Sequence, residues 1–294
     1  MNKSNKIIFV IILLITITVI GIIIMALSTT KQSEEAEGNG KFTIVTSFYP
    51  MYIATMNIIE GADVNLYNLS EPKTGCLHDY ELTTADMKLL SKADAFVVNG
   101  GGMEEFLPDI KANYPDLIII DASEGIDIEE DNAHVWMSIS DHIKQVENIT
   151  TGLCKADPTN ASIYQQNSAN YINKLQELLA TEDDSLKGKK VVLFSEAYEY
   201  LAKDFGLDVR GVLDLDEEKD ISAKELAETV DIVKRDKVPL IIAEKEYGEK
   251  MANAVMKETD VVSLYLDTII RGDYDKDSYI NRMKDNIELL KGTK

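Results

Sequence analysis

An unbroken apolar run covers residues 7–27 and directly follows Lys3 and Lys6. A helix that crosses a bilayer needs about 20 such residues, so the run predicts a membrane anchor over residues 1–28. The two lysines favour a cytoplasmic N-terminus, which places the rest of the chain outside the cytoplasm. A cleaved signal peptide is the alternative, because residues 26–28 offer a passable cleavage site. The length of the run favours the anchor, and no cysteine follows closely enough to carry a lipid.

After a polar, charged segment over residues 29–41, which predicts a flexible tether, strand patterns alternate with helical patterns. Short apolar runs predict strands over residues 42–46, 64–69, 95–98 and 117–120, the last of them buried. Helical periodicity predicts helices that end near Ile59 and that cover residues 84–92 and 103–112. This alternation is typical of a mostly parallel sheet, so residues 42–157 predict an α/β lobe.

A long helical pattern then leads to a second unit of the same kind. Asp157 and Pro158 predict an N-cap and first helical position, and a helix over residues 158–187 would connect the two units rigidly. Residues 188–294 predict the second α/β lobe. Its strands are predicted over residues 191–194, 209–213, 240–243 and 261–266, and its helices over 198–205, 222–235, 250–257 and 277–291.

Composition narrows the class of partner. The chain carries 51 acidic against 30 basic residues, a net charge of −21, and no cluster of Lys and Arg. A negative surface without such a cluster repels phosphate groups, which excludes nucleic acid as a partner. A phosphate-binding GxxxxGK[ST] loop, a GxSxG nucleophile elbow and an HExxH zinc helix are also missing from the sequence.

The three histidines point to metal chemistry. His78 and His134 lie in loops that follow strand patterns, where α/β folds place their ligands. Neutral imidazole binds zinc well and can bind manganese alongside carboxylates. His142 begins a helix, and we assign it no ligand role.

Carboxylates could complete such a site. Asp267 ends the strand pattern 261–266, and Ser195 and Glu196 directly follow the strand pattern 191–194. Capping of the next helix is the alternative role for Ser195 or Glu196. The only cysteines, Cys76 and Cys154, could form a disulfide outside the cell, and the sequence leaves this open.

These residues together resemble the cluster A-I substrate-binding proteins, the zinc- and manganese-binding subunits of bacterial ABC importers. The resemblance runs from Phe42 to the C-terminus. Residues 78–100 and 131–136, the latter reading DNAHVW, are similar to the family's first two ligand loops. Asp267 and the helix after it are similar to the last.

The resemblance implies two lobes joined by one long rigid helix, with Zn2+ or alternatively Mn2+ held between them. Matched residue by residue, His78 and His134 are ligands from the first lobe and Asp267 from the second. The third ligand of the family, His or Glu, matches Ser195, whose hydroxyl is a poor metal ligand. Glu196, water or a reduced Cys76 are the alternatives that could complete the site.

The sequence therefore predicts a monomeric, extracytoplasmic binding protein, not an enzyme, that delivers a divalent metal ion to an ABC transporter permease. A metal-dependent hydrolase that uses the open position at Ser195, with Glu196 or Glu244 as the base, is one alternative. A surface adhesin with a structural metal is the other.

Overall fold

Two four-stranded sheets organise the protein, seen in a computed structural model that describes residues 40–70, 77, 80–129, 132–180, 184–213, 215 and 222–293. The first sheet has the order β2-β1-β3-β4 and the second the order β6-β5-β7-β8, and every strand pairing is parallel. Two α/β lobes with parallel sheets are thereby confirmed. The strands are β1 (Thr43–Thr46), β2 (Asn65–Asn68), β3 (Ala95–Val98), β4 (Ile118–Asp121), β5 (Lys190–Leu193), β6 (Asp208–Val212), β7 (Leu240–Ala243) and β8 (Val262–Tyr265).

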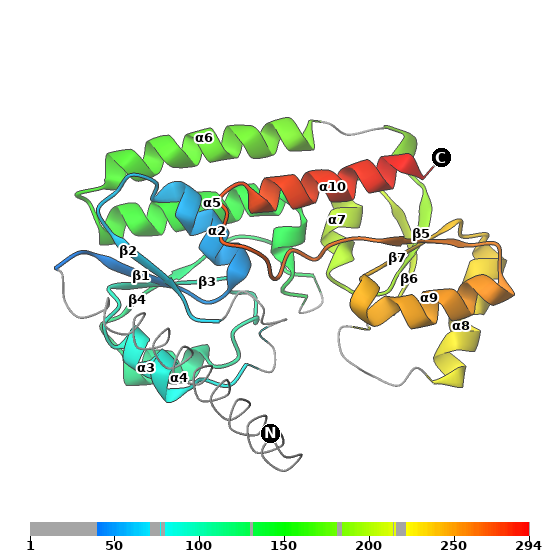
Figure 1. Ribbon diagram of the computed structural model, residues 1–294, viewed down its shortest axis with the longest axis horizontal. Helices are drawn as coiled ribbons and strands as arrows, with labels where there is room; N and C mark the ends of the chain where they lie inside the picture. Colours follow the sequence, from blue (N-terminus) through cyan, green and yellow to red (C-terminus); the bar gives the residue numbers. More distant parts are fainter. Residues whose placement is uncertain are drawn as a thin grey trace, which may run out of the picture.

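Helices cover the sheets and run between the lobes (Figure 1). The first lobe carries α2 (Tyr49–Ile58), α3 (Thr84–Leu90), α4 (Leu107–Asn113) and α5 (Ile139–Ala156). The second carries α7 (Tyr198–Asp204), α8 (Ala223–Asp236) and α9 (Lys245–Glu258). The remaining helices, α6 (Ala161–Leu179) and α10 (Ser278–Gly292), lie along the top of the molecule in Figure 1, and two short 3-10 helices are η1 (Val135–Met137) and η2 (Asp184–Leu186).

Local signals in the sequence start two of the helices. Thr83 caps α3 in a capping box with Asp86, and Ser222 caps α8 in one with Glu225. Each pair satisfies two backbone N–H groups that the first helical turn leaves without intrahelical partners. The sequence predicts the second of these boxes, because Ser222 is followed three residues later by Glu225, and the structure confirms it.

The long connecting helix differs from its prediction at both ends. Asp157 is the C-cap of α5, not an N-cap, and its carboxylate accepts hydrogen bonds from Asn160 and Tyr164. Asn160 precedes α6, which ends at Leu179 instead of continuing to residue 187. Lys174 on α6 forms an ion pair with Asp277, the N-cap residue of α10, at 3.1 Å.

Strand β4 is less buried than its composition predicts. Three consecutive isoleucines suggest a fully buried strand, yet Ile118 is 43% exposed and Ile120 only 5%. The reason is position, because β4 is the last strand of its sheet and pairs only with β3. A strand at a sheet edge leaves one side uncovered.

One apolar core continues from the first lobe into the second. Its members include Ile44 on β1, Leu193 on β5 and Ile242 on β7. Trp136 on η1 lies near the centre with no exposed surface, packed edge-on against Phe48 with ring centroids 5.0 Å apart. A continuous core makes the interface between the lobes part of the folded interior, since each lobe shields apolar surface of the other.

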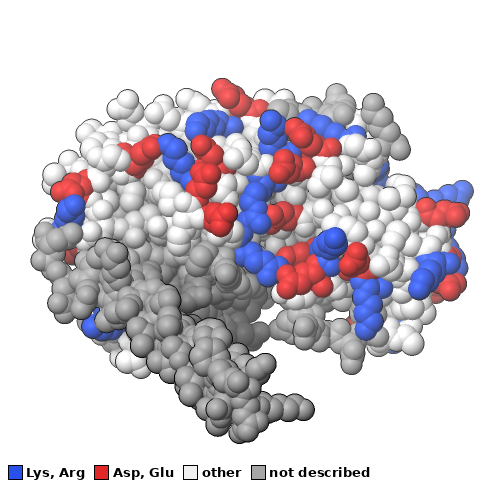
Figure 2. Space-filling view, viewed as in Figure 1, with Lys and Arg blue, Asp and Glu red and all other residues white. Residues whose placement is uncertain are grey.

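The charged residues on the face shown in Figure 2 are interspersed, with acidic and basic side chains side by side. Ion pairs between surface residues, such as Lys276–Glu60 and Arg271–Glu246, bring opposite charges together in the same way. Within the described part of the chain, no helix is both long enough and apolar enough to cross a bilayer. The predicted anchor over residues 1–28 lies outside the described residues, as does most of the tether.

Candidate metal centre

The candidate ligands of the second lobe leave one edge of its sheet. Glu196 follows β5, Glu244 follows β7 and Asp267 follows β8, and these three strands are neighbours. Because the strands are parallel, all three carboxylates belong to the edge formed by the strands' carboxyl ends. Trp136 of the first lobe reaches this edge, where its Nε1 donates to the carbonyl of Thr268 at 2.9 Å. The first lobe therefore packs directly onto the acidic edge of the second.

His134 lies at this junction with its ring held in one orientation. Its side chain is buried, at 1% exposure, in the loop between β4 and η1. The side-chain carbonyl of Asn132 lies 2.9 Å from His134 Nδ1 and also accepts from the His134 backbone N at 3.1 Å. A carbonyl oxygen can only accept, so Nδ1 carries a proton, and in the neutral ring Nε2 then has the lone pair. Metal-binding histidines are commonly fixed by such a partner.

The amide of Asn132 is oriented by partners in the second lobe. Its Nδ2 donates to the backbone carbonyl of Glu196 at 2.9 Å and to the Glu199 carboxylate at 3.1 Å. Both partners are acceptors, which fixes which end of the amide is nitrogen. Asn132, 2% exposed, was not recognised from the sequence because an Asn in a loop has no pattern that distinguishes it.

Glu196 and Ser195, the candidates for the third ligand, have different surroundings. Glu196 Oε1 lies 3.4 Å from His134 Nδ1, and its side chain is 34% exposed. The structure therefore brings Glu196 beside His134, on the Nδ1 side of the ring. Ser195 is 1% exposed, and its Oγ accepts from Ala197 N at 3.2 Å within the turn before α7. The residue at the N-cap position of α7 is Ala197, so neither Ser195 nor Glu196 caps that helix as expected.

Asp267 is held from several directions. Asn286 on α10 accepts from the Asp267 backbone N and donates to its carbonyl, at 2.9 and 2.8 Å. One carboxylate oxygen accepts from Ile269 N at 2.7 Å, and the other forms an ion pair with Arg282 at 2.6 Å. Ile269 takes a left-handed conformation, with φ of 57°, which lets the backbone turn back toward the carboxylate. A carboxylate has about four lone-pair sites, so these contacts leave capacity for a cation.

Arg282 is a second residue near the site that sequence reasoning missed. It also donates to the carbonyl of Arg271, whose own side chain pairs with Glu244 and Glu246. Positive charge therefore balances the acidic edge of the second lobe. A bound cation would share Asp267 with Arg282.

Four further residues were considered from the sequence: His78, Cys76, Cys154 and His142. His78 and Cys76 lie outside the described residues, and Cys154 is a free thiol. His142 is fully buried on α5, stacked on Tyr279, with Gln145 beside its Nδ1 at 3.1 Å, in keeping with a packing role. Across the described ranges, which omit His78, no three His, Cys, Asp or Glu residues are grouped closely enough to hold a metal ion.

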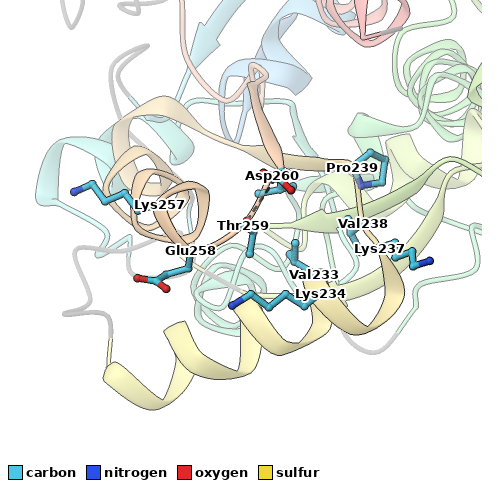
Figure 3. A pocket seen from close by; sticks show the side chains of 10 residues that line it. Val233, Lys234, Lys237, Val238, Pro239, Lys257, Glu258, Thr259 and Asp260 are labelled. Carbon is cyan, nitrogen blue, oxygen red and sulfur yellow. Dashed lines mark hydrogen bonds between the residues drawn. The ribbon is translucent and has the colours of Figure 1, made fainter.

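A cavity of about 600 Å³ lies elsewhere on the second lobe (Figure 3). It is lined by the ends of α8 and α9 and by the residues that precede β7 and β8, including Lys234, Lys237 and Lys257. This is the amino end of the strands, opposite the edge that carries Glu196 and Asp267. Its three lysines outnumber its two carboxylates, Glu258 and Asp260, which does not favour a cation, so the candidate metal centre is the junction of the lobes.

Comparison with known proteins finds relatives along almost the whole of the chain after residue 43. A family profile described as "Zinc-uptake complex component A periplasmic" matches residues 44–293. The chain is 31% identical to the high-affinity zinc uptake system protein ZnuA of Bacillus subtilis, over 90% of this chain and 91% of that protein. It is 29% identical to the manganese-binding lipoprotein MntA of Halalkalibacterium halodurans, over 88% and 89% of the two chains.

A solved structure extends the similarity to the fold. The substrate-binding protein FpvC of Pseudomonas aeruginosa, solved in complex with Mn2+, superimposes with a TM-score of 0.77. The match has 27% sequence identity and covers 86% of this chain and 98% of FpvC. The family suggested by the ligand-loop motifs is thereby confirmed: the chain belongs to the ZnuA family of metal-binding components of ABC uptake systems.

Proposed function

We propose that this protein captures a divalent transition metal outside the cytoplasm and delivers it to an ABC permease, with zinc as the first choice and manganese as the second. The observation that carries the proposal is the His134 ring, whose Nδ1 is held by Asn132 so that Nε2 carries the lone pair. Relatives named for zinc uptake and for manganese binding support this choice of cargo. Neutral imidazole and carboxylate together suit either ion.

The proposed ligands are His78, His134 and Asp267. Glu196 is the most suitable residue for the remaining position, which is the third ligand position of the family. Glu196 lies on the Nδ1 side of His134 and is 34% exposed, so its side chain would have to turn to reach an ion bound at Nε2. Ser195 is a weaker choice, because its hydroxyl already accepts a hydrogen bond in a buried turn. Water and the thiolate of Cys76 are the remaining options.

A binding role suits these groups better than hydrolysis does. A hydrolase would need a carboxylate base that is not neutralised by a cation. Glu244 lies 2.9 Å from Arg271 and also accepts from Thr268 at 3.4 Å. The carboxylate of Glu244 is therefore already engaged in an ion pair and a hydrogen bond, which does not suit a general base.

The mode of membrane attachment is also part of the proposal. The apolar run over residues 7–27 would anchor a monomer to the outer face of the membrane by one uncleaved helix. MntA is a lipoprotein, whereas the first cysteine of this chain is Cys76. N-terminal sequencing of the membrane-bound protein tests this point, since a mature chain that begins near Ser28 would show a cleaved signal peptide instead.

Metal titration of purified residues 41–294 tests the function. The apo protein, stripped with a chelator, is titrated with zinc and then manganese, each in competition with a chromophoric chelator. We expect His134→Ala and Asp267→Ala to weaken zinc binding by at least the roughly 10- to 100-fold that loss of an outer-shell partner causes. Asp260→Ala, at the cavity of Figure 3, is the matched control and should bind like the wild type.

Failure of the wild-type protein to bind either metal would refute the proposal. Equal binding by the wild type and both ligand variants would place the metal elsewhere. Delivery is tested in the source cells, where deletion of this protein should make growth depend on added zinc. The wild-type chain, but not His134→Ala, should restore growth without added zinc.

A further inference from the structure

Asn132 joins His134 to the turn between β5 and α7 by hydrogen bonds on both sides, beside the direct approach of Glu196 Oε1 to His134 Nδ1 at 3.4 Å. Its amide group has two donor hydrogens and two acceptor lone pairs, and all four have partners. The two acceptor positions serve His134, in the first lobe. The two donors serve Glu196 and Glu199, which lie 64 and 67 residues further along the chain, in the second lobe.

The backbone around Asn132 is fixed in the same way. Its carbonyl accepts from the hydroxyl of Tyr200, in the second lobe, at 2.7 Å. Its N–H donates to the carbonyl of Glu129, in the first lobe, at 2.8 Å. The residue is 2% exposed, so water is largely excluded as a replacement partner when one of these bonds breaks.

We propose that Asn132 is a positioning residue that makes the presentation of His134 to the metal depend on docking of the turn formed by residues 195–200. This rests on the proposed function of His134 as a ligand. When the turn lies against the first lobe, its acceptors hold the Asn132 amide and the amide oxygen holds Nδ1–H. When the turn moves away, the amide can rotate, and the ring is no longer restricted to the tautomer with its lone pair on Nε2.

The consequence is a link between lobe docking and metal affinity that needs no contact between Glu199 and the ion. The turn also carries Ser195 and Glu196, the two candidates for the third ligand position. Docking of the turn would therefore bring the third ligand position to the site and, through Asn132, align the His134 ring. Release of the turn would weaken both at once.

A double-mutant cycle tests the coupling. Asn132→Ala removes all four side-chain bonds, whereas Glu199→Ala removes one acceptor and leaves Asn132 intact. Because loss of an outer-shell partner costs about 10- to 100-fold in metal affinity, each single variant should weaken zinc binding by up to this amount. If Glu199 acts on the metal through Asn132, the double variant should bind no more weakly than Asn132→Ala alone.

Glu199→Gln separates hydrogen bonding from charge. Glutamine keeps an oxygen that can accept from Asn132 Nδ2 but removes the negative charge, so this variant should bind zinc like the wild type. Thermal unfolding of each apo variant checks that it is folded. Should Asn132→Ala fail to fold, Glu199→Ala and Glu199→Gln still test the idea, since Glu199 is only partly buried.

A second readout needs no metal. Nitrogen-15 NMR of labelled histidine in the apo protein at pH 8 should show His134 as the Nδ1–H tautomer in the wild type and in Glu199→Gln. A mixture of tautomers is expected in Asn132→Ala and Glu199→Ala. Additive losses of affinity, or an unchanged tautomer in Asn132→Ala, would overturn the inference. A wild type that binds no metal but shows the tautomer change would instead refute the proposed function alone.

Discussion

The buried imidazole of His142 should give the stability of this protein a pH dependence that one substitution removes. His142 lies on α5 with no exposed surface, stacked on Tyr279 with ring centroids 4.0 Å apart. Its Nδ1 lies 3.1 Å from Gln145 Oε1, and its Nε2 has no hydrogen-bond partner among the described residues. Burial disfavours the charged ring and lowers the pKa of His142 from 6.5 to about 4.

The size of the effect follows from the difference in pKa between the folded and unfolded chain. The unfolded chain binds this proton more tightly, so acid favours unfolding. The stabilising contribution is complete above the unfolded pKa and is lost as pH falls through the folded one. One pKa unit corresponds to about 1.4 kcal/mol, which gives a loss of about 2 kcal/mol at pH 5 and about 3 kcal/mol at pH 4.

The substitution His142→Phe keeps an aromatic ring on Tyr279 and removes the titration. At pH 7.5 two effects oppose each other, because Gln145 loses a partner while the unpaired Nε2 disappears. Each is worth about 1–3 kcal/mol, so the free energy of unfolding at pH 7.5 should change by less than about 2 kcal/mol. Between pH 7.5 and pH 5 the variant should gain about 2 kcal/mol relative to the wild type.

Urea unfolding followed by the fluorescence of Trp136, the only tryptophan, measures both proteins at several pH values with a chelator present. Groups that titrate in both proteins cancel in the difference, provided that the dependence on urea is the same. A difference in free energy that stays constant from pH 7.5 to pH 5 would refute the reasoning. It would mean that the imidazole of His142 titrates alike in the folded and unfolded chain.

Three further predictions concern other parts of the structure. Burial raises the pKa of Glu104 from 4.5 to about 7, so the folded protein loses stability as pH rises and this carboxyl ionises. Between pH 5 and pH 7.5 the free energy of unfolding of Glu104→Gln should therefore rise by about 2 kcal/mol relative to the wild type. A shift of opposite sign in urea unfolding would contradict this. Asp204 accepts from Ser138 and from the N-terminus of α5; Asp204→Ala should lower the free energy of unfolding by about 1–3 kcal/mol, whereas the exposed-pair control Asp208→Ala should change it by less than about 1 kcal/mol. Ser195→His supplies an imidazole at the third ligand position and should raise zinc affinity in chelator competition on the order of 10-fold, about 1.4 kcal/mol; unchanged affinity would indicate that the third position is filled without residue 195.

Sequence periodicity was most reliable where a short segment is determined by its own residues. The capping box of Ser222 and Glu225 is an example, since both partners lie within one helical turn. It failed at Asp157, where the same residue type suits both an N-cap and the end of the preceding helix. It also failed for β4, because three isoleucines do not reveal that their strand lies at a sheet edge.

By itself, the sequence determined the two parallel α/β lobes, the family and the candidate ligands His134 and Asp267, because each depends on local periodicity or on residues close together in the chain. Only the tertiary structure decided what surrounds those ligands. The ion pair of Asp267 with Arg282 forms when α10 packs beside the end of β8. The contacts of Asn132 join residues 64 and 67 positions apart, and no local pattern encodes such a meeting. Their partners become neighbours only when the two lobes share one core.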